Sequence, residues 1–133
     1  MNESKRYHFI LIDDSKLDCF IGEKVIQSIE RHISLSVFMD AKEALEFIKN
    51  REVDENKTIV LVDIQMPLMT GFEFIESFEQ MVDEDKQANY AIHLLSSSIN
   101  ENDMIKARSY KSVNDFLNKP IRKDTLRDMV DKL

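Results

Sequence analysis

The sequence predicts an α/β fold in which a doubly wound, five-stranded parallel sheet lies between two layers of helices, a three-layer αβα arrangement. Short apolar runs alternate five times with segments of helical periodicity, and such alternation implies right-handed crossovers between parallel strands. Most of these runs are apolar without interruption, as in strands that are buried on both faces. At 133 residues the chain fits one domain, and we expect residues 1–133 to form it without an output domain.

The first two strand–helix pairs are read from the N-terminal third of the chain. The run His8–Ile12 is apolar and compact and predicts the first strand, and Ser15 can cap the helix that follows it. Residues 34–37 alternate between serine and an apolar residue, as in a second strand. Asp40 and Glu43 then form a pair that resembles a capping box, which predicts the start of the second helix.

The third pair occupies the middle of the chain. The run Thr58–Val62 is rich in β-branched residues and predicts the third strand. Thr70 and Glu73 form another capping pair, so we expect the third helix to begin there. The stretch Asp83–Asn89 is polar, and we expect it to be a loop.

The last two pairs are read in the same way. The apolar run Ala91–Leu95 predicts the fourth strand, and Asn100 can cap the helix after it. Val113–Leu117 predicts a short fifth strand, and Lys123–Leu133 predicts the final helix. No repeat or linker separates a second domain from these elements.

The composition argues against several classes of function. With a net charge of −7, the surface repels phosphate backbones, so we expect no direct nucleic-acid binding. Gly22 and Gly71 are the only glycines, too few for a glycine-rich phosphate-binding loop. The chain has no apolar run of the roughly 20 residues that a membrane span needs, no signal-peptide segment and a single cysteine, Cys19. We therefore expect a cytoplasmic protein that does not act at a membrane.

Polar side chains follow the predicted strands at the points where they end. Asp13 and Asp14 follow the first strand, Asp63 the third, Ser96 the fourth and Lys119 the fifth. In a sheet of this type, ligands bind at the carboxyl ends of the strands. The sequence thus predicts a site with three carboxylates, a hydroxyl and an ammonium at one edge of the sheet.

Three carboxylates at one place repel one another, and a hard cation such as Mg²⁺ relieves that repulsion. A carboxylate can itself act as a nucleophile and form an acyl phosphate, whose charge a nearby lysine can neutralise. A more ordinary interpretation is also open, because Asp13 and Asp14 can be turn or capping residues and Ser96 can be a helix cap.

Four motifs, in this order and at these spacings, resemble the response-regulator receiver domain of two-component signalling, in its single-domain, chemotaxis-regulator-like form. The resemblance extends from about Tyr7 to the C-terminus and implies the flavodoxin-like (βα)5 receiver fold. The motifs are Ile12-Asp13-Asp14, Val62-Asp63-Ile64-Gln65-Met66-Pro67 with Gly71, Leu95-Ser96-Ser97, and Lys119-Pro120.

The resemblance assigns roles around the phosphoacceptor. It implies that Asp63 accepts the phosphoryl group and that Lys119 pairs with the phosphoryl oxygens. It further implies that Asp13, Asp14 and Asp63, with the backbone carbonyl of Gln65, hold Mg²⁺, and we expect no other cofactor. The Lys119-Pro120 peptide bond is expected to be cis.

Two more positions match residues that change conformation in the family. Ser96 matches the switch hydroxyl, and Phe116 matches the aromatic switch position, where tyrosine is common. A phenylalanine cannot donate a hydroxyl hydrogen bond, and Phe116 can equally be an ordinary core residue.

The resemblance implies a signalling switch rather than a classical enzyme. A histidine kinase or histidine phosphotransfer protein would phosphorylate Asp63, and output would follow through the face formed by the fourth helix, fifth strand and fifth helix, or by onward phosphotransfer. Phosphatases with an aspartate nucleophile carry a second aspartate two residues later, where this chain has Gln65. The alternative is a receiver-like binding module that works without phosphate.

Overall fold

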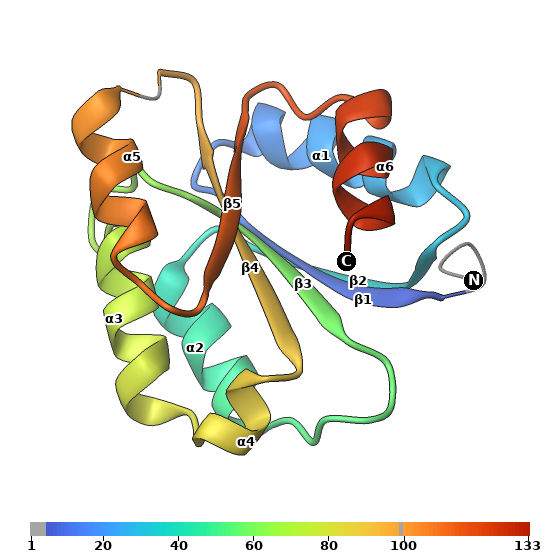
Figure 1. The fold of residues 1–133 in the computed structure, drawn as a ribbon. Helices are drawn as coiled ribbons and strands as arrows, with labels where there is room; N and C mark the ends of the chain where they lie inside the picture. Colours follow the sequence, from blue (N-terminus) through green and yellow to red (C-terminus); the bar gives the residue numbers. More distant parts are fainter. Residues whose placement is uncertain (1–4, 99) are drawn as a thin grey trace.

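The computed structural model describes residues 5–98 and 100–133, which form a five-stranded, all-parallel sheet with the strand order β2-β1-β3-β4-β5 (Figure 1). The predicted fold class is confirmed. The strands are β1 (Tyr7–Ile12), β2 (His32–Phe38), β3 (Thr58–Asp63), β4 (Tyr90–Ser96) and β5 (Val113–Asn118). The helices are α1 (Lys16–Ser28), α2 (Ala41–Asn50), α3 (Gly71–Met81), α4 (Glu84–Gln87), α5 (Glu101–Arg108) and α6 (Lys123–Asp131).

Helices cover both faces of the sheet. In Figure 1, α1 and α6 lie on one side of the strands, and α2, α3 and α5 lie on the other. Alternate residues of β1 and β3 pack into separate core clusters on the two sides, because successive side chains of a strand point to opposite faces. Val60 and Val62 face α2 and α3, for example, whereas Ile59 and Leu61 face α1 and α6.

The position of each strand in the sheet explains its sequence. All six residues of the central strand β3 are buried, which matches its uninterrupted apolar run. The edge strands β2 and β5 are only partly buried, so each tolerates polar residues such as Ser34, Ser36 and Asn114. A burial pattern of this kind is what the alternating serines of β2 indicate.

The predicted helix starts are confirmed, with one change of detail. The side chains of Ser15, Asp40, Thr70 and Asn100 all accept a hydrogen bond from a backbone N–H in the first turn. At Thr70 the capping box with Glu73 is complete. The Asp40 side chain accepts from the backbone N–H of Lys42, not of Glu43, so the expected capping-box bond is not the one that forms here.

The stretch Asp83–Asn89, which was expected to be a loop, contains the short helix α4. Gln87 explains the order: its side-chain amide donates to the backbone carbonyls of Glu79 and Val82, at 3.0 and 2.6 Å. The end of α3 leaves carbonyls without a helical partner, and Gln87 satisfies two of them. Among the described residues, the helices are all too short or too polar to cross a bilayer.

Candidate functional site

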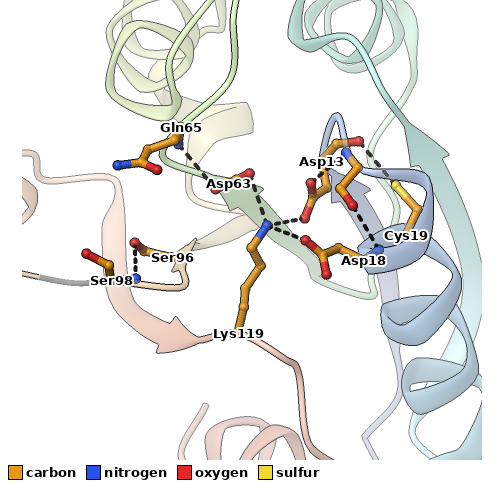
Figure 2. Close-up of polar contacts among 9 residues, drawn as sticks. Asp13, Asp18, Cys19, Asp63, Gln65, Ser96, Ser98 and Lys119 are labelled. Atoms are coloured by element: carbon orange, nitrogen blue, oxygen red, sulfur yellow. Dashed lines mark hydrogen bonds and ion pairs between the residues drawn. The ribbon is translucent and has the colours of Figure 1, made fainter.

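The carboxyl ends of the strands bring the predicted polar residues to one edge of the sheet, as expected for this topology. Asp13 directly follows β1, Asp63 is the last residue of β3, and Ser96 is the last residue of β4. Lys119 directly follows β5, and its bond to Pro120 is cis, as predicted. Figure 2 shows the Lys119 side chain extending from the end of β5 toward the carboxylates of the first and third strands.

Lys119 forms the centre of the site. Its Nζ donates to Oδ2 of Asp13 at 2.8 Å and to Oδ2 of Asp63 at 3.1 Å (Figure 2). A third hydrogen bond, at 2.9 Å, reaches Oδ2 of Asp18 on α1. An ammonium has three N–H donors, so these carboxylates use all of them. Burial alone would lower the pKa of Lys119, but the three hydrogen bonds outweigh it and hold the pKa above its usual value.

Asp63 is buried at the end of the central strand, with 5% of its surface exposed. Its Oδ1 accepts from the backbone N–H of Gln65 at 3.2 Å, while Oδ2 accepts from Lys119. Burial raises the pKa of the Asp63 carboxyl, and the hydrogen bond from Lys119 offsets this only in part. Asp63 is therefore a fixed carboxylate with one lysine beside it.

Asp13 is held as firmly as Asp63. It is 1% exposed, and its Oδ1 accepts from the backbone N–H of Ser15 at 3.0 Å. The backbone carbonyl of Asp13 accepts from the Cys19 thiol. Burial raises the pKa of Cys19 to about 11, so the thiol stays protonated and can keep donating at neutral pH. Cys19 is thus a structural residue that ties α1 to the end of β1.

Asp13, Asp14 and Asp63 form an acidic cluster in which one carboxylate oxygen from each residue lies within 4.8 Å of the others. Asp14 is exposed, so the cluster opens to solvent. Mg²⁺ prefers oxygen ligands, uses few carboxylates and keeps several waters, so this donor set fits it. The predicted fourth ligand is the backbone carbonyl of Gln65, whose N–H is already fixed beside Asp63.

Neither of the two predicted switch residues bonds to Asp63 among the described contacts: Ser96 ends β4, and Phe116 lies within β5. Ser96 is 2% exposed, and its Oγ accepts from the backbone N–H of Ser98 at 3.0 Å. Phe116 is half-buried against the core cluster on the α5 side of the sheet. The guanidinium of Arg108 lies 5.9 Å from the centroid of its ring.

Gly71 supports the loop behind Asp63. Its backbone N–H donates to the carbonyl of Ile64 at 2.9 Å, which draws the start of α3 against the end of β3. A Cβ at this position would lie 2.7 Å from the Asp63 carbonyl oxygen and 2.9 Å from Ile64 Cα. Both are backbone atoms, so only glycine allows this approach. In the sequence, only the family motif connected Gly71 with Asp63.

Asp18 is the site residue that sequence reasoning missed. It lies in the first turn of α1, where an acidic residue is common for local reasons. The available signal was its position on the helix that starts directly beside the acidic pair. That signal is weak, because the contact with Lys119 joins residues 101 positions apart.

Comparisons with known proteins identify the family of this chain. Residues 9–131 match the model of the response regulator receiver domain, and the chain belongs to this family. It is 28% identical to the two-component response regulator ORR3 of Oryza sativa over 86% of this chain and 81% of that protein.

Solved structures agree as well. A response regulator receiver protein from Dyadobacter fermentans has a TM-score of 0.86 at 28% identity, covering 95% of this chain and 96% of the other. The receiver domain of the Saccharomyces cerevisiae response regulator Ssk1, solved with the histidine phosphotransfer protein Ypd1, shares the fold (TM-score 0.77, 20% identity, 95% and 87% covered). The chain is therefore a receiver domain of two-component signalling.

Proposed function

We propose that this chain is a phosphorylation-dependent switch in which Asp63 accepts a phosphoryl group from a phosphohistidine. One observation carries the proposal: a buried carboxylate at the end of the central strand shares an ammonium with a second carboxylate at the edge of an acidic cluster. This arrangement offers a nucleophile, a cation site and a fixed positive charge, which together are what phosphoryl transfer needs.

The chemistry follows from these groups. An oxygen of Asp63 forms a bond to phosphorus as the phosphorus–nitrogen bond of the phosphohistidine breaks, and the departing imidazole takes up a proton. Mg²⁺, held by Asp13, Asp14, Asp63 and the Gln65 carbonyl, would neutralise charge on the transferred group. Lys119 already donates to Asp63, and its ammonium can move to a phosphoryl oxygen without leaving the site.

The phosphoryl donor is a histidine kinase or a histidine phosphotransfer protein. Support for this comes from the family and from the solved complex of the similar Ssk1 receiver domain with Ypd1. A cytoplasmic location is part of the proposal, because histidine kinases use ATP. We also propose that the receiver domain signals by binding another protein or by passing the phosphoryl group onward.

Output is proposed to use the face formed by α5, β5 and α6. In the resting structure the Ser96 hydroxyl accepts from Ser98. Turning toward a phosphoryl group on Asp63 would release that contact, shift the loop after β4 and change the space around Phe116. The phosphoryl group would thus bias an equilibrium between two states of this face.

A phosphate-independent binding module is the alternative function. Burying the charges of Asp63 and Lys119 costs stability. A module that works without phosphate would have no use for this buried pair that offsets the cost. A classical phosphatase is disfavoured, because Gln65 stands where an acid/base carboxylate would be needed.

The direct test is to incubate the protein with acetyl phosphate and Mg²⁺ and to measure its intact mass. We expect one added phosphoryl group, lost in Asp63→Asn and in a sample without Mg²⁺. Ser97→Ala is the matched control, since Ser97 is exposed and should leave the adduct unchanged. If Asp63→Asn is labelled to the same extent as the wild type, Asp63 is not the acceptor.

A further inference from the structure

Asp18 provides Lys119 with a contact that the switch proposal does not use. The distance between Lys119 Nζ and Asp18 Oδ2 is 2.9 Å, as short as the contacts with the other two carboxylates (Figure 2). The Asp18 side chain is 31% exposed, whereas those of Asp13 and Asp63 are 1% and 7% exposed. Asp18 therefore loses less hydration than its two neighbours when it pairs with the lysine.

The first turn of α1 fixes the position of Asp18. Ser15 caps the helix by accepting from the Asp18 backbone N–H, and the Ser15 N–H donates to Asp13 Oδ1. The helix start is thus tied to the carboxylate at the end of β1. Figure 2 shows the Asp18 carboxylate beside that of Asp13, on the α1 side of Lys119, with Asp63 at the end of β3.

Asp18 differs from the other two partners of Lys119 because it is not a predicted cation ligand. Asp13 and Asp63 both belong to the acidic cluster, and Asp18 does not. A divalent cation in the cluster and the ammonium of Lys119 would therefore compete for the same two carboxylates. Asp18 is the one partner that the lysine can keep when the cation binds.

We propose that Asp18 is a positioning residue: it gives the Lys119 ammonium a carboxylate partner outside the acidic cluster and thereby leaves Asp13 and Asp63 available to a divalent cation. Without it, both remaining partners of Lys119 would be cation ligands, and the lysine would oppose cation binding more strongly. The inference rests on the proposed function, because it concerns the same cation and the same lysine.

The test is the dissociation constant for Mg²⁺ alone, measured by titration calorimetry on the full chain without a phosphodonor. Asp18→Asn keeps the shape of the side chain and removes its charge, and we expect it to raise the dissociation constant about fivefold, in the range of couplings between contacting residues. Asp18→Glu restores the carboxylate and should return the constant to within about twofold of wild type.

Two comparisons separate positioning from a general loss of charge. Glu23 lies on the same helix and makes no hydrogen bond to Lys119 in the described part of the chain, so Glu23→Gln should change the constant by less than about twofold. In a Lys119→Met background, Asp18→Asn should also have less than about a twofold effect, because no ammonium remains to be held.

The outcomes distinguish the inference from the proposed function. If Asp18→Asn and Glu23→Gln weaken Mg²⁺ binding equally, the effect is one of general charge and the inference is overturned. The same holds if Asp18→Asn weakens Mg²⁺ binding equally in the wild-type and Lys119→Met backgrounds. A wild type that binds Mg²⁺ together with an unchanged Asp18→Asn variant would overturn the inference alone. A wild type that binds no Mg²⁺ would overturn the metal-binding part of the proposed function and this inference with it.

Circular dichroism checks that each variant is folded. The Asp18→Asn, Asp18→Glu and Glu23→Gln series decides the question even if Lys119→Met does not fold.

Discussion

At the scale of single residues, His93 is a buried titratable group that lies outside the proposed chemistry. It is 2% exposed in the middle of β4, and its Nδ1 has no hydrogen-bond partner among the described residues. Burial lowers the pKa of His93 to about 4, against a smaller opposing effect from the Ala91 backbone and Asp115. The folded protein therefore keeps His93 neutral at a pH where the unfolded chain protonates it.

This difference makes stability depend on pH in a defined window. Above pH 6.5 His93 is neutral in both the folded and the unfolded state, so it does not make the free energy of unfolding depend on pH. Between pH 6.5 and about 4, the unfolded chain binds a proton at His93 that the folded protein does not. Stability should therefore fall as pH drops through this window, by about 2–3 kcal/mol at its lower end. His93→Leu should remove that part of the loss, as measured by urea unfolding at neutral pH and near the lower limit. Parallel losses in the two proteins would show that His93 does not titrate in this way.

At the scale of elements, the junction between β3 and α3 depends on close backbone contact at Gly71. Gly71→Ala should lower the free energy of unfolding by about 1–3 kcal/mol, because the new Cβ meets backbone that must shift. The same shift moves Asp63, so phosphorylation by acetyl phosphate should slow by at least about tenfold.

Gly22→Ala is the matched control for this prediction. Its Cβ would lie 2.8 Å from Leu11 Cδ2 and 3.1 Å from Ile121 Cδ1, which are the ends of side chains and can move. In a helix interior, alanine is also more favourable than glycine by about 1 kcal/mol, which offsets part of the cost of crowding. A larger loss for Gly22→Ala than for Gly71→Ala, or an unchanged rate for Gly71→Ala, would contradict this view of the junction.

The same elements show what the sequence could and could not predict. Asp13, Asp63, Ser96 and Lys119 were predictable because each follows a strand, and parallel strands end at one edge. The contact between Asp18 and Lys119 was not predictable, since a helix residue meets a distant lysine only once the two elements pack. The helix α4 was missed for a related reason, because Gln87 orders it by bonding to the end of α3 rather than through any local pattern.

At the scale of the whole molecule, the site lies where the firmly packed part of the fold meets a lightly packed part. The β3 strand is entirely buried, and α3 buries five residues, whereas α5 buries only Ala107. Elements with few buried apolar contacts open at the lowest cost. A charge added at Asp63 should therefore move α5 and the loop before it more readily than the central sheet.

The most direct test of this account is to add beryllofluoride, a phosphoryl analogue, with Mg²⁺ and to follow the backbone amides by NMR. We predict that beryllofluoride binds only with Mg²⁺ and shifts the amide signals of Asp63, Lys119 and Ser98. The signal changes should extend to Phe116 and α5, and the Asp63→Asn substitution should abolish binding. Binding confined to the acidic cluster, with α5 and Phe116 unchanged, would contradict the switch. No binding at all would leave a receiver fold that works without phosphate.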